Sequence, residues 1–301
     1  MPPRVSIGLP VYNGERFIKE SIDSLLNQTF IDFEIIISDN ASTDSTEQIC
    51  RDYLKIDKRI KYLRQGENKG ALANFVIVLE NSSGQYFMWA SSDDKFSSNH
   101  LEKLVQALEL NNGVSVSMSN AKIIDESGIV LSQTNIQDLR NSQTRNKLSY
   151  ALALGSKHHY FIYGLWIRSI LNSILPIPNC RYCDRIFILY ASTVIKFKVV
   201  SEPTYYRRKH NQPSWYRYTK TDFELSKLYR SNYESVKSII FLSKKLSKNP
   251  TIANSFSTRY GLVLAYTYWV LIGMLYSVRI AQPLRIILKY FGFRQTHFGV
   301  K

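Results

Sequence analysis

The first 125 residues alternate between short apolar runs and longer amphipathic segments, and this alternation restricts the chain to few folds. Runs rich in β-branched residues predict strands at 4–13, 32–42, 59–65, 85–94 and 114–125. Apolar residues at helical spacing predict helices at 14–29, 43–55, 68–84 and 99–111. Such alternation predicts an α/β fold, with a mostly parallel sheet covered by helices on both faces.

Polar side chains stand at the ends of three of these strands. Asp39 ends the second strand, Asp93 and Asp94 end the fourth, and the first runs into a turn at residues 10–13 (PVYN). Ligands of such sheets bind where the carboxyl ends of strands gather, so we expect these groups to share one edge. The adjacent carboxylates Asp93 and Asp94 repel each other, which predicts a neutralising partner: a divalent cation, an arginine, or only solvent and a helix N-terminus.

The composition fits a folded protein of a reducing compartment. Hydrophobic residues make up 45% of the 301-residue chain, which argues against wholesale disorder. The three cysteines are too few for a disulfide scaffold. The opening stretch MPPRVSIGLP has no long apolar run, and we expect no signal peptide there.

Positive charge is concentrated in the last third of the chain. Residues 1–200 hold 22 Lys and Arg against 20 Asp and Glu, whereas residues 201–301 hold 17 against 4. The resulting charges of +2 and +13 predict a polyanionic partner for the last third, either nucleic acid or an anionic membrane surface. No nucleic-acid-binding motif accompanies this charge, and we therefore expect no nucleic-acid partner.

Two segments of this basic region favour a membrane surface. Residues 260–278 carry no charge and just reach the roughly 20 residues that span a bilayer. Residues 280–295 (IAQPLRIILKYFGFRQ) predict a basic amphipathic helix of the kind that lies in a membrane interface. Three interpretations stay open: peripheral attachment to an anionic membrane through residues 259–294, a helical packing or oligomer contact, and a membrane span. We expect the first, at the cytoplasmic face of the cell membrane.

Several stretches, in order, resemble family 2 glycosyltransferases, which have the GT-A fold. They are VSIGLPVYNGERFIKESIDSLLNQTFIDFEIIISDNASTDST (5–46), ENKGALAN (67–74), WASSDDKFSSNHLEKLV (89–105), CDRIFILYAS (183–192) and SEPTYYRRKHNQPS (201–214). The resemblance covers roughly residues 4–215. It implies a GT-A catalytic domain over 1–215, with a nucleotide-sugar half at 1–125 and an acceptor and base half at 126–215. A basic α-helical tail at 216–301 follows.

Two positions depart from the family pattern. The D-x-D motif reads Ser92-Asp93-Asp94, so a serine replaces the first carboxylate. The base helix usually begins Glu-Asp and here reads Cys183-Asp184, which removes an acidic neighbour but keeps the Asp.

The resemblance implies a donor site for a nucleotide sugar, commonly a UDP-sugar. The residues carried over to this site are Pro10, Tyr12, Asn13, Asp39, Asn68, Gly70, Asp93 and Arg207. Asp94 would bind Mn²⁺ or Mg²⁺ directly, and His210 would join the metal shell. Most of these positions also have a structural interpretation: turn geometry for residues 10–13, helix capping for Asp39 and the acidic pair, and a solvated basic strand for Arg207 and His210.

Asp184 is the implied general base of an inverting transfer. The sugar would move from the nucleotide diphosphate to a hydroxyl of a glycan or lipid-linked acceptor, in polysaccharide biosynthesis of the cell envelope. The structural alternative for Asp184 is a helix-start residue or the partner of a nearby arginine. The functional alternative is a catalytically weak nucleotide- or glycan-binding relative of the same fold, which the cysteine at 183 keeps open.

Overall fold

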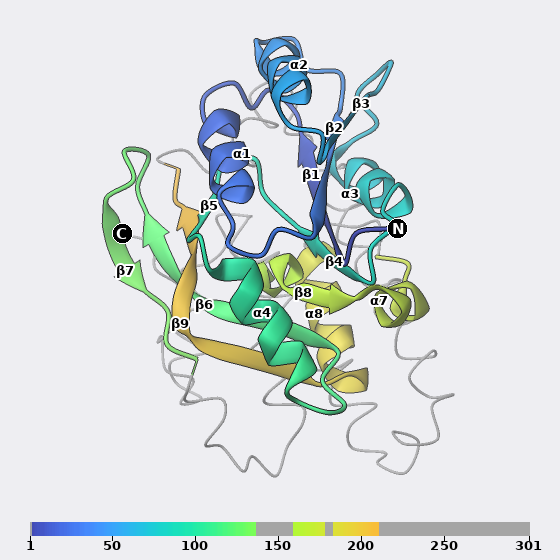
Figure 1. Cartoon of the computed structure of the whole chain (residues 1–301), viewed down its shortest axis with the longest axis vertical. Helices are drawn as coiled ribbons and strands as arrows, with labels where there is room; N and C mark the ends of the chain where they lie inside the picture. Colours follow the sequence, from blue (N-terminus) through green and yellow to red (C-terminus); the bar gives the residue numbers. More distant parts are fainter. Residues whose placement is uncertain (1, 137–158, 178–182, 211–301) are drawn as a thin grey trace, which may run out of the picture. The chain divides into compact units, whose positions relative to one another are not determined.

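The computed structural model of the chain describes residues 2–136, 159–177 and 183–210 (Figure 1). A sheet of nine strands runs through them, in the order β3-β2-β1-β4-β8-β6-β9-β5, with β7 paired to β6. The strands are β1 (Val5–Val11), β2 (Phe33–Asp39), β3 (Ile60–Arg64), β4 (Tyr86–Trp89), β5 (Lys95–Phe96), β6 (Val116–Ile124), β7 (Val130–Gln133), β8 (Leu165–Ile167) and β9 (Phe197–Arg208). The helices are α1 (Ile18–Leu26), α2 (Thr46–Ile56), α3 (Ala71–Glu80), α4 (His100–Glu109), α7 (Arg168–Ile174), α8 (Cys183–Val194) and the 3-10 turn η1 (His159–Tyr163).

The α/β alternation expected for the first 125 residues is confirmed. β1, β2, β3 and β4 pair side by side in parallel, and β6 pairs in parallel with β9. Every residue of β2 is buried, including Glu34, Ser38 and Asp39, as expected for a strand whose centre at 35–37 is apolar. Figure 1 shows α1 on one side of β1 and β2 and α3 on the other. Gly8 permits the close approach of α3, because a Cβ there would lie 2.6 Å from Val78 Cγ2.

Three short strands escape prediction from local patterns. β5, β7 and β8 hold two, four and three residues. All three pair antiparallel with their neighbours: β5 with β9, β7 with β6, and β8 with β4 and β6. β5 occupies Lys95–Phe96, between the predicted strand at 85–94 and the predicted helix at 99–111, and α4 begins at His100, close to the predicted start. Runs this short carry too few positions for a period of two to be recognised.

Strand register brings the predicted site residues to one edge. In the parallel pairs, Val11 lies beside Asp39 and Asp39 beside Arg64, so three strands end at the same level. β5 then turns back to pair with β9, Lys95 opposite Tyr206, which brings the acidic pair to the end of β9. The edge predicted from the parallel sheet is therefore present, and β9 completes it from far along the chain.

Several predictions concern residues outside the described part of the chain. The basic tail at 216–301, its uncharged segment at 260–278 and its membrane contact at 259–294 all lie there. Among the described helices, none has the length and apolar character needed to cross a bilayer. The domain boundaries near 125 and 215 stay predictions.

Candidate functional site

The loop after β1 and the loop after β2 are joined by hydrogen bonds between side chains and main chain. Asn13 N–H donates to Ser42 Oγ at 2.9 Å, and Asn13 Oδ1 accepts from Thr43 N–H at 2.8 Å. Asn13 has a φ of 51°, a left-handed conformation that asparagine tolerates better than most residues. Further main-chain N–H groups donate to side chains across the two loops: Gly14 to Thr46 Oγ1, Glu15 to Asp44 Oδ2, and Ser45 to Glu15 Oε2. The predicted site residue Asn13 thus shapes the loop, while Tyr12 beside it is 39% exposed.

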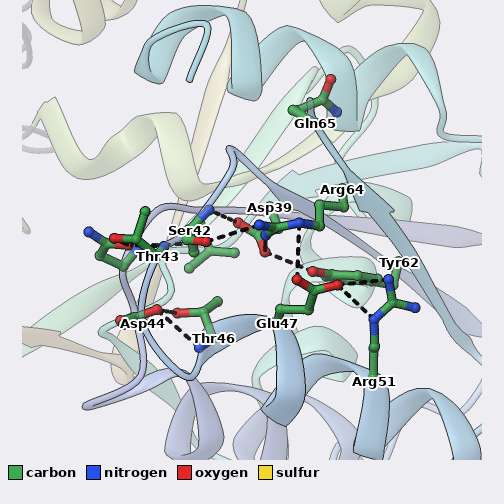
Figure 2. A network of polar contacts seen from close by, with 12 residues as sticks. Asp39, Ser42, Thr43, Asp44, Thr46, Glu47, Arg51, Tyr62, Arg64 and Gln65 are labelled. Atoms are coloured by element: carbon green, nitrogen blue, oxygen red, sulfur yellow. Dashed lines mark hydrogen bonds and ion pairs between the residues drawn. The ribbon is translucent and has the colours of Figure 1, made fainter. Parts of the chain in front are cut away.

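Asp39 lies fully buried at the end of β2 (Figure 2). Its Oδ1 accepts the Ser42 N–H at 2.8 Å. Its Oδ2 accepts the Tyr62 hydroxyl at 2.7 Å and pairs with Arg64 Nη1 at 2.8 Å. Both carboxylate oxygens are therefore engaged, and the main local effect of Asp39 is to orient Arg64 and Tyr62 at the edge where β2 and β3 end.

Tyr62 and Arg64 are site candidates that sequence reasoning missed. Arg64 donates to Asp39 and to the Ser42 carbonyl, and its Nε lies 3.0 Å from Glu47 Oε2. One third of its side chain stays exposed. The available signal was the period of two in β3: residues 62 and 64 share one face, and Arg64 ends the strand in register with Asp39.

The segment before α3 is attached to the end of β2 through Asn40. Asn40 Nδ2 donates to Asn68 Oδ1 at 2.7 Å, and Asn40 Oδ1 accepts the Lys69 N–H at 2.9 Å. Asn68 Oδ1 also accepts the N–H of Gly70, whose φ of 85° suits glycine. Asn68 and Gly70 are both exposed at the N-terminal end of α3, and Asn40 positions them.

The acidic pair lies in the turn between β4 and β5, and its two carboxylates differ sharply. Asp94 is 4% exposed; its Oδ1 accepts the Arg208 N–H at 2.7 Å, and its Oδ2 accepts the Tyr205 hydroxyl. The Asp93 side chain is 34% exposed, and its Oδ2 lies 2.5 Å from His210 Nε2. The accessible carboxylate is therefore Asp93, although the resemblance had implied Asp94 as the direct metal ligand.

The pKa values of the two groups move in opposite directions. Burial, with the neighbouring Asp93 charge, raises the pKa of Asp94 to about 7. Burial also acts to raise the pKa of Asp93, but hydrogen bonds from His210 and Ser91 outweigh it and hold that pKa below its usual range. In the metal-free site, Asp93 is therefore the carboxylate of the pair that loses its proton more readily.

We expect Asp94 to make the metal-free fold less stable as pH rises. The folded pKa of about 7 exceeds the unfolded value of about 3.9, so the folded state binds the proton more tightly. The contribution of the protonated Asp94 to the free energy of unfolding is fully present below the unfolded pKa, and it is lost as pH rises through the folded pKa of about 7. Urea unfolding of wild type and Asp94→Asn between pH 4 and 8 measures it. The variant should gain stability relative to wild type across this window, and a pH-independent difference would contradict the assignment.

Asp93 and His210 fit a hard divalent cation. Among the described residues, no three His, Cys, Asp or Glu side chains converge into a ready-made metal site. Mg²⁺ and Mn²⁺ in nucleotide enzymes nevertheless need only one or two protein ligands, because phosphate and water supply the rest. The buried His210 Nδ1 has no hydrogen-bond partner in the described part of the chain and lies 3.8 Å from Glu126 Oε1. With Nε2 on a metal, Nδ1 would carry the proton and face this carboxylate.

The predicted base Asp184 and Arg207 are both coupled electrostatically to the surroundings of the acidic pair. Asp184 is in the first turn of α8, which packs against η1. Burial raises the pKa of the Tyr163 hydroxyl at the end of η1, and the charges of Asp94, Asp93 and Asp184 raise it further. Arg207 lowers the pKa of both Asp94 and Tyr163. Tyr163, which sequence reasoning missed, is thus coupled electrostatically to the acidic pair, Asp184 and Arg207, and its ring lies 6.1 Å from that of Tyr205, which donates to Asp94.

The chain matches a known family over most of the described region. The family model for glycosyl transferase family 2 matches residues 6–173, more than half of the chain. An uncharacterized glycosyltransferase of Haemophilus influenzae is 35% identical over 160 residues, which are 52% of this chain and 50% of that protein. The putative teichuronic acid biosynthesis glycosyltransferase TuaG of Bacillus subtilis is 38% identical over 104 residues, 35% of this chain and 41% of TuaG. The chain thus spans half or less of these two relatives.

Solved structures of glycosyltransferases share the fold at low sequence identity. TarS from S. aureus, solved with UDP-GlcNAc, has a TM-score of 0.64 and 17% identity over 91% of this chain and 73% of that one. The mannosyltransferase PcManGT from Pyrobaculum calidifontis, solved with GDP-Man and Mn²⁺, has a TM-score of 0.56 and 15% identity over 97% of this chain and 80% of that one. The sheet has the GT-A fold, and the chain belongs to glycosyl transferase family 2.

Proposed function

We propose that this glycosyltransferase is a metal-dependent inverting enzyme that uses a nucleotide-diphosphate sugar, with UDP as the nucleotide. The observation that carries the proposal is the Asp93–His210 pair, a charged carboxylate and an imidazole 2.5 Å apart at the edge that also holds Asp39 and Arg64. The structures similar in fold were solved with UDP-GlcNAc or with GDP-Man and Mn²⁺, which supports a nucleotide-sugar donor.

In this proposal, the nucleotide binds at the edge of the sheet formed by the loops after β1, β2 and β3. Arg64, held by Asp39, and the half-exposed Tyr12 face the base and ribose. Asn68 and Gly70 present the N-terminal end of α3, where exposed N–H groups favour anionic oxygens. Pro10 lies near the end of β1, paired with Ser38, and Asn13 shapes the loop that follows.

Asp93 and His210 would hold Mn²⁺ or Mg²⁺, which supplies positive charge for the departing diphosphate. Arg207 adds a fixed cation near the acidic pair. Asp184 takes the proton of the acceptor hydroxyl while the oxygen of that hydroxyl forms a bond to the anomeric carbon. The bond from that carbon to the diphosphate breaks on the opposite face, so the configuration inverts.

The acceptor we propose is a hydroxyl of a glycan or a lipid-linked glycan, with the enzyme on the cytoplasmic side of the cell membrane. The similarity to TuaG, named for teichuronic acid biosynthesis, supports a polysaccharide of the cell envelope. The basic amphipathic sequence at 280–295 supports an anionic membrane surface as a partner.

Calorimetric titration tests the donor class directly. UDP, GDP, CDP and ADP are each titrated into the full chain with and without Mn²⁺. We expect one diphosphate, UDP, to bind tightly only when Mn²⁺ is present. Equal binding with and without metal would refute metal dependence, and no binding of any diphosphate would refute the donor site. Binding with no sugar transfer or donor hydrolysis would favour the catalytically weak relative.

A further inference from the structure

Arg208 stands at a junction of four segments around the acidic pair, and neither the sequence motif nor the family comparison assigns it a role. It is the last residue of β9, and its side chain is 1% exposed. Arginines are rarely buried unless every donor finds an acceptor, because an unpaired buried charge is costly. The partners of this guanidinium therefore indicate what the residue holds in place.

Each nitrogen of the Arg208 guanidinium donates to a different segment. Nε donates to the Asp93 carbonyl at 2.8 Å. Nη1 donates to the carbonyls of Asp125 and Glu126 at 3.1 and 3.0 Å, in the turn between β6 and β7. Nη2 forms a short contact with the Glu20 carboxylate on α1. The guanidinium also lies over the Phe17 ring, 4.4 Å from its centroid.

The main chain of the same residue holds the other half of the acidic pair. Arg208 N–H donates to Asp94 Oδ1 at 2.7 Å, while its side chain holds the Asp93 carbonyl. One residue thus limits the positions of both aspartates. It also fixes the main chain of Glu126, whose carboxylate lies 3.8 Å from His210 Nδ1. Phe17 packs against His210 as well, with ring centroids 5.7 Å apart.

We propose that Arg208 is the positioning residue that sets the distance between Asp93 and His210 and thereby the affinity of the site for its metal. This inference rests on the proposed metal-dependent function. Only a planar fork can donate to two carbonyls of one turn, a third carbonyl of another loop and a carboxylate at once. Lysine has a single nitrogen, which cannot span these four acceptors, so it keeps the charge but releases at least one loop.

Glu20 forms the outer end of this arrangement. It accepts from Arg208 through Oε2 and from Lys95 Nζ through Oε1 at 2.7 Å, and its side chain is 43% exposed. Burial acts to raise its pKa, but Lys95 and Arg208 together hold that pKa below the usual range. Removing its charge should loosen the guanidinium without leaving the buried carbonyls unpaired, which makes Glu20→Gln a milder version of the same change.

The chain offers a matched control in Arg16. Like Arg208, Arg16 places its guanidinium near the Phe17 ring, 4.8 Å from the centroid, and contacts Glu126, at 2.8 Å. Unlike Arg208, its side chain is 61% exposed, and it pairs with the carboxylate of Glu126 and not with the main chain. Arg16→Lys therefore changes the same residue type in the same neighbourhood without touching the carbonyls of the two loops.

The test is calorimetry of full-length Arg208→Lys, Glu20→Gln, Arg16→Lys and wild type, titrated with UDP at several Mn²⁺ concentrations. Outer-shell changes at metal sites typically cost about 10- to 100-fold in metal affinity. We expect a loss of this size in the Mn²⁺ dependence for Arg208→Lys, a smaller one for Glu20→Gln and none for Arg16→Lys. Excess Mn²⁺ should restore UDP binding in Arg208→Lys, because the ligands themselves remain. Unchanged Mn²⁺ affinity in Arg208→Lys would overturn the proposal.

Hydrogen–deuterium exchange of the metal-free proteins separates this proposal from the proposed function. Peptides over 90–96 and 124–130 should exchange faster in Arg208→Lys than in wild type and Arg16→Lys, while peptides over β2 should not change. Equal exchange in those two regions would overturn the positioning role even if wild type binds metal. Failure of wild type to bind UDP with Mn²⁺ would refute the function instead. If Arg208→Lys does not fold, Glu20→Gln carries both measurements.

Discussion

Asp184→Asn is expected to lower the rate of sugar transfer by about 100- to 10,000-fold, the range that a positioned general base contributes. The amide keeps the shape of the side chain in the first turn of α8 but cannot take a proton. UDP binding with Mn²⁺ should stay near the wild-type level, because the donor pocket is formed by other residues. The loss should therefore appear in kcat, measured by release of UDP with a glycan acceptor at saturating donor.

The matched control for this change is Asp52→Asn. Asp52 is an exposed carboxylate on α2 that pairs with Lys55 within the same helix, so removing its charge should leave transfer unchanged. If Asp184→Asn kept more than about a tenth of wild-type kcat, a loss smaller than a general base contributes, Asp184 would be a structural residue at the helix start. Loss of UDP binding in Asp184→Asn would equally contradict its role as base.

The second large effect is expected at Asp93. Asp93→Asn removes the negative charge beside His210, on a side chain that is 34% exposed. The Mn²⁺-dependent affinity for UDP should fall by more than about 100-fold, because the loss of a direct ligand exceeds the usual cost of an outer-shell change. Transfer should fall with it, because the departing diphosphate loses its counter-charge. Calorimetry with UDP and Mn²⁺ measures the first loss and a transfer assay the second.

Asp94→Asn is the decisive comparison for Asp93. The Asp94 carboxylate is buried and already accepts hydrogen bonds from the Arg208 N–H and the Tyr205 hydroxyl. In Asp94→Asn, the amide oxygen can still accept from Arg208, and the amide nitrogen can donate to the tyrosine oxygen. We expect a smaller loss of metal affinity than in Asp93→Asn. The reverse order, with Asp94→Asn the weaker binder, would return the metal to Asp94, as the family resemblance had implied.

The two members of the acidic pair show what local sequence patterns report and what they omit. The apolar run over residues 86–89 followed by two carboxylates was enough to predict a strand that ends at a ligand edge. Nothing in the run distinguishes Asp93 from Asp94, because both carboxylates belong to the turn that follows the strand. Their different burial arises from β9, which brings Tyr205 and Arg208 against Asp94 from more than 110 residues away.

The nucleotide side of the site shows the same division. Asp39 was recognised from its place at the end of a strongly apolar strand, and the structure confirms that place. Its use as a support for Arg64 depends on β3, whose register with β2 puts Arg64 beside it. Arg64 and Tyr62 belong to a short strand of mixed polarity, which gave no reason to single them out.

The sequence by itself determined the α/β class, the order of the long strands and helices, and the edge at which the ligand residues gather. These follow from local periodicity and turn residues, which act over a few positions at a time. Only the tertiary structure decided which aspartate is accessible, which arginine is buried, and that β5 pairs with β9. Those outcomes depend on contacts between segments far apart in the chain, where each donor must find an acceptor once water is excluded.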